Sequence, residues 1–146
     1  MTRVLVIDSS VAVKWFKPDD EPGLDEALAL LEQHRDRAIT LAAPAHLGLE
    51  VPNALWSRRL DETTLRQVAQ DLEDYDLEWH PIDCALARDA AAISARHRLT
   101  LYDAAFAALA VALDAELVTA DRALAESRAC RVRLLGDESV LLRRTD

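Results

Sequence analysis

Short apolar runs alternate along this chain with longer stretches in which apolar residues recur at helical spacing. The short runs predict strands over Val4–Asp8, Ala38–Ala43, Leu77–Ile82, Glu116–Thr119 and Val132–Leu135. The longer stretches predict helices over Val11–Phe16, Leu24–Leu31, Ala45–Leu60, Asp61–Tyr75, Cys84–His97 and Tyr102–Asp114. Because strands alternate with helices, we expect an α/β fold with a mainly parallel central sheet.

Length and composition are typical of one domain. The chain has 146 residues, of which 51% are apolar, and no linker, repeat or low-complexity tract divides it, so we expect a single domain over residues 1–146. Its two cysteines are far apart in the sequence and predict neither a disulfide framework nor a cysteine zinc site. The longest apolar run, Ala104–Leu113, is about half of a membrane span. The run before Asp8 is too short for a secretory signal, so we expect a cytoplasmic protein.

The chain is strongly acidic, with 26 acidic and 17 basic residues and a formal net charge of −9. A negative surface repels nucleic acid at long range, which argues against a protein that coats nucleic acid in general. It does not argue against an enzyme whose acids gather in one metal pocket.

Two acids directly follow predicted strands. Asp8 ends the first strand, and Asp121 comes just after Glu116–Thr119. The carboxyl ends of parallel strands meet at one edge of a sheet, where α/β proteins bind ligands. Asp121 could instead be only a helix N-cap.

Two further acids lie where helices are predicted. Asp103 is near the start of its helix, where it could be only a first-turn acid, but where the helix dipole also favours an ionised carboxylate. Glu50 is flanked by apolar residues, and a Glu in that setting is seldom buried without a partner. No Lys or Arg occurs between residues 38 and 57, so its partner must come from elsewhere in the fold or be a cation.

If the four acids meet, their mutual repulsion favours a bound cation. Two carboxylates about 5 Å apart repel by roughly 3 kcal/mol at an effective dielectric constant of about 20. Oxygen ligands favour Mg²⁺ or Mn²⁺ over zinc. An ion held in this way can polarise a phosphodiester and activate water, so the pattern indicates phosphodiester hydrolysis.

The residues around these acids resemble the signature of the PIN domain, in particular that of the VapC-type ribonuclease toxins of type II toxin–antitoxin pairs. The stretches that carry the resemblance are Val6–Val11 (VIDSSV), Pro44–Leu55 (PAHLGLEVPNAL), Leu101–Phe106 (LYDAAF) and Leu117–Arg122 (LVTADR). Each stretch is weakly specific alone. Their order and spacing are specific together, and the resemblance covers essentially the whole chain.

The resemblance implies a PIN-like domain whose parallel sheet is sandwiched by helices. It implies that four acids bind Mg²⁺, with Mn²⁺ as an alternative ion, and that Thr119 supports the site; these acids are Asp8, Glu50, Asp103 and Asp121. It also implies toxic endonucleolytic cleavage of RNA, neutralised by a VapB-like antitoxin. The protein would form a homodimer and would contact operator DNA only through the antitoxin.

Two residues near Glu50 give further expectations. Pro52 departs from the usual family pattern, and we expect it to kink the helix within a turn of Glu50. His46 precedes Glu50 by one helical turn and could line the mouth of the site. No His or Cys spacing supports a zinc site or a histidine base.

Two other classes of protein stay open at this point. One is a non-catalytic PIN-like module that binds RNA or protein, although such a module has no reason to keep four mutually repelling acids. The other is a phosphotransfer domain, either a receiver or a phosphatase of the haloacid dehalogenase type. The phosphatase needs Asp-x-Asp, whereas this chain has Ser10 two residues after Asp8.

Overall fold

A five-stranded parallel sheet forms the centre of the molecule. The computed structural model describes residues 2–16, 19–56 and 59–136. The strands are β1 (Arg3–Ile7), β2 (Ile39–Pro44), β3 (Glu78–His80), β4 (Glu116–Thr119) and β5 (Val132–Leu134). Their order is β3-β2-β1-β4-β5, and every neighbouring pair is parallel. The chain therefore builds the sheet outward from β1 in one direction and then crosses to the other side of β1.

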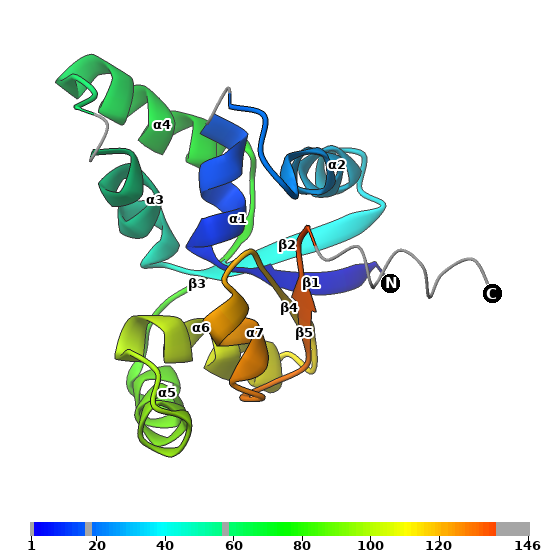
Figure 1. The fold of residues 1–146 in the computed structure, drawn as a ribbon, viewed down its shortest axis with the longest axis vertical. Coiled ribbons are helices and arrows are strands. Elements are labelled where there is room, and N and C mark those ends of the chain that lie inside the picture. Colours follow the sequence, from blue (N-terminus) through cyan, green and yellow to red (C-terminus); the bar gives the residue numbers. More distant parts are fainter. Residues whose placement is uncertain (1, 17–18, 57–58, 137–146) are drawn as a thin grey trace.

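Helices cover both faces of this sheet (Figure 1). On one face lie α1 (Ser9–Val13), α2 (Leu24–Arg35), α3 (Leu47–Trp56) and α4 (Glu62–Asp74). On the other lie α5 (Cys84–His97), α6 (Leu101–Ala112) and α7 (Arg122–Glu126). None of the helices in the described ranges is long and apolar enough to cross a membrane.

The two central strands are apolar at consecutive positions because helices cover both of their sides. Leu5, Val6 and Ile7 of β1 are buried, as are Leu117 and Val118 of β4. A strand with one face in water would alternate apolar and polar residues instead. The register pairs Ile7 with Val118, so the residues that follow these two strands also come side by side.

The predicted α/β architecture is confirmed. The short helix α7 is not among the predicted elements, and the other differences lie at the ends of elements. The helix expected over Val11–Phe16 is α1 followed by a 3-10 turn, η1 (Lys14–Phe16). The helix expected from Ala45 begins at Leu47 and continues through Pro52, so the proline does not end it. Part of its expected C-terminal end, residues 57–58, lies outside the described residues.

The strand order also decides against one of the phosphotransfer alternatives. Receiver domains have the order 2-1-3-4-5, in which the third strand lies beside the first. Here β1 lies between β2 and β4, and β3 is at the edge of the sheet. The chain is therefore not a receiver domain.

Replacing Leu5 by Ala should lower the free energy of unfolding by about 2–5 kcal/mol, because the substitution leaves a cavity in the central strand. The matched substitution Leu28→Ala, at a side chain that is 44% exposed on α2, should cost less than about 1 kcal/mol. Urea unfolding followed by circular dichroism measures both. Equal losses for the two variants would contradict the placement of β1 in the core.

Candidate active site

Two of the predicted acids lie at the point where the chain changes direction across the sheet. Asp8 directly follows β1, and Asp121 follows β4 by two residues. The two strands are hydrogen-bonded neighbours, and the N–H of Asp8 donates to the carbonyl of Val118 at 3.2 Å. In α/β sheets, this reversal of strand order is where ligands bind, outside the carboxyl ends of the strands.

Hydrogen bonds to both oxygens fix the Asp8 carboxylate. The hydroxyl and the backbone N–H of Ser10 donate to Oδ1, the latter at 3.1 Å, and the hydroxyl of Thr119 donates to Oδ2 at 2.7 Å. The backbone bond forms because Asp8 is the N-cap of α1. Asp8 is only 4% exposed, so these donors replace water that the carboxylate has lost.

The hydroxyls of Ser10 and Thr119 also accept hydrogen bonds from the backbone just after β4. A backbone N–H in that segment donates to Ser10 Oγ at 2.8 Å, and the N–H of Asp121 donates to Thr119 Oγ1 at 2.9 Å. Thr119 is fully buried, and its hydroxyl both accepts and donates a hydrogen bond. Asp121 is in turn the N-cap of α7, so its cap role and its place at the site coincide.

Asp103 reaches the site from the start of α6, on the opposite face of the sheet from α3. Its backbone N–H donates to the hydroxyl of the N-cap Thr100 at 3.1 Å. Partial burial raises the pKa of Asp103, and the nearby charges of Asp121 and Glu50 raise it further. A hydrogen bond with Thr100 and the proximity of His46 act in the opposite direction. The Asp103 carboxylate therefore interacts electrostatically with both Glu50 and Asp121.

Burial is the main reason why the pKa of Asp8 rises to about 6. The charge of Asp103 adds to this rise, whereas the hydrogen bonds from Ser10 and Thr119 lower the pKa. Asp8 thus interacts electrostatically with Asp103, and Asp103 interacts with Glu50 and Asp121. These pairwise interactions are consistent with the expected meeting of the four acids, which stays a prediction.

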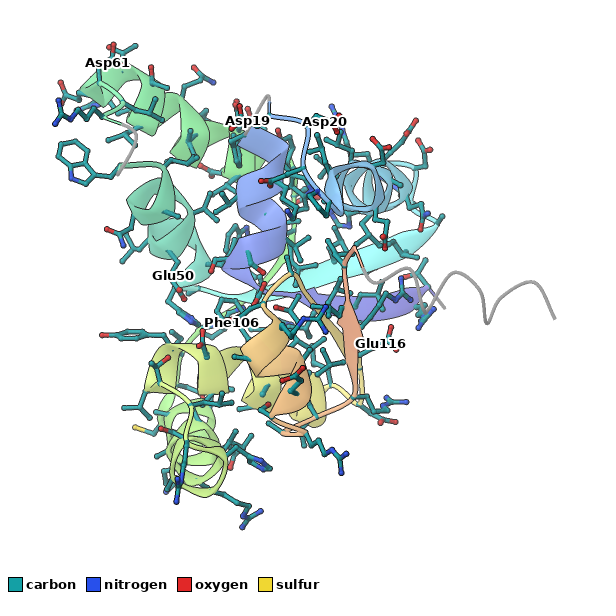
Figure 2. All side chains as sticks on the ribbon, in the orientation of Figure 1. Asp19, Asp20, Glu50, Asp61, Phe106 and Glu116 are labelled. Carbon is teal, nitrogen blue, oxygen red and sulfur yellow. The ribbon has the colours of Figure 1, made fainter. Side chains whose placement is uncertain are left out.

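Glu50 lies at the end of α3 nearest to the sheet, on the side that faces α6 (Figure 2). Its Oε2 accepts a weak hydrogen bond from the hydroxyl of Ser9 at 3.4 Å. Its Oε1 is buried and has no hydrogen bond, although the Nε2 atom of His46 is 3.0 Å away. The N–H bond of that ring points at the carbonyl of Tyr102, which lies at the same distance of 3.0 Å. A buried carboxylate oxygen without a donor is costly unless a cation completes it.

The residues present fit a hard divalent cation. The donors are carboxylate oxygens, which Mg²⁺ and Mn²⁺ prefer. Among residues 2–16, 19–56 and 59–136, no Lys or Arg forms an ion pair with any of the four acids. In the same ranges, no three His, Cys, Asp or Glu side chains already converge as a metal-binding group.

Sequence reasoning selected the four acids and Thr119 but missed the roles of Ser9, Ser10 and Thr100. Thr100 could have been found, because Thr-x-x-Asp before an apolar helix resembles a capping box. The two serines carry no comparable signal, since a Ser beside an Asp is common and its partner depends on the fold.

Replacing Asp8 by Asn should raise the stability of the metal-free protein at pH 7.5 by up to about 3 kcal/mol. The folded pKa of about 6 exceeds the ordinary aspartate pKa of 3.8, so folded wild-type protein binds the proton more tightly and loses stability as pH rises between these values. The variant carries no such charge, so the two proteins should converge near pH 4. Urea unfolding in EDTA from pH 4 to 8 measures the difference.

The control for this experiment is Asp61→Asn. A backbone hydrogen bond from Thr64 lowers the pKa of exposed Asp61, so removing its charge should not produce a gain that grows with pH. Wild-type protein that is more stable than the Asp8 variant at pH 7.5 would show that the Asp8 hydrogen bonds outweigh desolvation.

Comparisons with known proteins agree with this fold. The family described as the PIN domain matches residues 5–128. Ribonuclease VapC3 of Pyrobaculum aerophilum is 30% identical over 132 residues, which are 84% of this chain and 92% of the relative. Two structural neighbours share the fold. VapBC2 from Rickettsia felis has a TM-score of 0.68 and 14% sequence identity, and the match covers 90% of this chain and 98% of that one. VapC20 from Mycobacterium tuberculosis has a TM-score of 0.69 and 15% sequence identity, and the match covers 88% of this chain and 98% of that one. The chain belongs to the PIN domain family.

Proposed function

We propose that this protein is a VapC-like endoribonuclease that hydrolyses RNA phosphodiester bonds with Mg²⁺, or with Mn²⁺ in its place. The observation that carries the proposal is the buried Glu50 oxygen without a hydrogen bond, together with the interaction of Asp103 with the charges of Glu50 and Asp121. The name of the relative VapC3 supports the RNA substrate, as does the description of VapC20 as a toxin that cleaves the sarcin–ricin loop.

Four side chains would hold the metal: Asp8, Glu50, Asp103 and Asp121. The chemistry that a bound divalent ion supplies is polarisation of the phosphodiester, activation of water and compensation of negative charge. Ser10 and Thr119 orient the Asp8 carboxylate by donating to its two oxygens. Thr119 also fixes the backbone of Asp121, so one buried hydroxyl positions two of the acids.

The proposed partner is a VapB-like antitoxin. One structural neighbour, from Klebsiella pneumoniae, is described as a toxin–antitoxin complex, and VapBC2 from Rickettsia felis and VapBC from Salmonella typhimurium are described as bound to DNA. We propose that this chain contacts operator DNA only through its antitoxin, forms a homodimer, acts in the cytoplasm and uses residues 1–146 as one PIN domain.

The alternative is a PIN module that binds RNA or protein without cutting it. Such a module would gain stability by losing one of the acids, because a buried, repelling carboxylate costs free energy when no cation is bound. The presence of all four acids together with the orienting hydroxyls favours the enzyme.

Replacing Asp103 by Asn should reduce the Mg²⁺-dependent cleavage rate at least 100-fold, because the site loses an anionic ligand while the N-cap bond of α6 stays. Cleavage of labelled RNA by purified, antitoxin-free protein measures this, with circular dichroism to check the fold. Asp89→Asn, at an exposed position on α5, is the matched control and should leave the rate unchanged. Undiminished cleavage by wild-type protein in EDTA would refute the mechanism.

Expression of the chain alone in a bacterial host should arrest growth, and the Asp103→Asn variant should not. Co-expression with a short neighbouring reading frame that encodes the antitoxin should restore growth and yield a complex that co-purifies. Growth counts after induction and size-exclusion chromatography measure the two effects. If the co-purified complex cleaves RNA as fast as the free protein, the proposed role of the antitoxin is wrong.

A further inference from the structure

Helices α3 and α6, which carry Glu50 and Asp103, lie on opposite faces of the sheet (Figure 1). His46 is hydrogen-bonded to residues of both helices. It directly precedes α3, which carries Glu50 one turn later, and its backbone carbonyl accepts the N–H of Glu50 at 3.0 Å. Its side chain contacts α6 at Tyr102, the neighbour of Asp103. Among the residues that the structure describes, this is the one side-chain hydrogen bond between segment 45–56 and α6.

The direction of that hydrogen bond determines whether His46 can also donate a proton to the Glu50 carboxylate. A carbonyl oxygen only accepts, so Nε2 of His46 carries the proton and donates it to Tyr102 at 3.0 Å. The same nitrogen lies 3.0 Å from Glu50 Oε1, and that oxygen has no hydrogen bond of its own. His46 therefore lies against the Glu50 carboxylate without donating a hydrogen bond to its buried oxygen.

Aromatic packing prevents the His46 ring from moving away. Its centroid lies 4.5 Å from that of Phe106 and 6.3 Å from that of Tyr102. Phe106 is fully buried, and the His46 side chain is 10% exposed. A ring held on one side by a core residue and at its tip by a backbone carbonyl is a rigid spacer.

We propose that His46 is a positioning residue that sets the separation between the Glu50 and Asp103 carboxylates through its Nε2 hydrogen bond to Tyr102. This inference rests on the proposed function, since the separation matters because the two acids hold one metal ion. Metal affinity depends on how well such supporting contacts orient the ligands, and losing one typically costs 10–100-fold.

Two substitutions separate the hydrogen bond from the packing. His46→Phe keeps an aromatic ring against Phe106 but lacks the donor, whereas His46→Gln loses the ring but can place an amide N–H near the Nε2 position. The Phe variant should bind Mn²⁺ at least tenfold more weakly than wild type, and the Gln variant within about threefold. Titration followed by electron paramagnetic resonance measures the affinity, and thermal unfolding of the metal-free proteins reports the packing.

RNA cleavage at varied Mn²⁺ concentration supplies a second readout. The Phe variant should need at least tenfold more metal for half-maximal rate, with an unchanged KM for RNA at saturating metal. His80→Phe is the control, because His80 also lies 3.0 Å from a carboxylate, that of Glu78, but on strand β3. It should leave both the affinity and the metal dependence unchanged.

Each outcome decides the role of His46. Mn²⁺ affinity that stays within threefold of wild type in the Phe variant overturns the inference, as does equal weakening in the Phe and Gln variants, since the hydrogen bond would then not matter. Wild-type protein that binds no Mn²⁺ also overturns it. If wild type binds Mn²⁺ but does not cut RNA, the proposed function fails while the comparison of affinities still tests His46.

Discussion

The parallel pairing of β1 with β4 is the constraint on which the site depends. Two segments more than a hundred residues apart reach the same edge of the sheet because Ile7 lies in register with Val118. The residues that follow, Asp8 and Thr119, are then close enough for a 2.7 Å hydrogen bond. A shift of one residue in this register would turn every side chain of the shifted strand to the other face and separate the carboxylate from its donor.

The environment of Asp8 opposes stability and favours cation binding. Burial raises the free energy of the charged form, and the donors from Ser10 and Thr119 offset only part of that rise. The remaining unfavourable free energy of the charged form is removed either by protonation or by a bound cation, since no Lys or Arg of the described ranges pairs with the site acids. Functional sites commonly keep such unfavourable charges, whereas a site with only a structural role would lose them.

The sequence was informative where local pattern decides structure and silent where tertiary contacts decide it. Consecutive apolar residues predicted β1 and β4, and the acid after each strand predicted the edge at which Asp8 and Asp121 lie. The five-residue helix α7 was indicated only by the possible N-cap role of Asp121, because so short a segment shows no periodicity. His46 was expected only near the mouth of the site, because its bond to Tyr102 depends on how α3 and α6 approach one another.

The charge of the whole chain determines how an RNA substrate could be held. At −9, the protein repels a polyanion at distances where single side chains cannot be distinguished, so long-range attraction does not bring RNA to the site. Attraction therefore has to arise at short range, where a divalent ion between the carboxylates offsets several negative charges at once. On this reasoning, one ion serves three needs: it relieves the repulsion among the acids, satisfies the buried Glu50 oxygen and offers positive charge to a phosphate. A spacer such as His46, which holds Glu50 near Asp103 without occupying its oxygen, is what such a site requires.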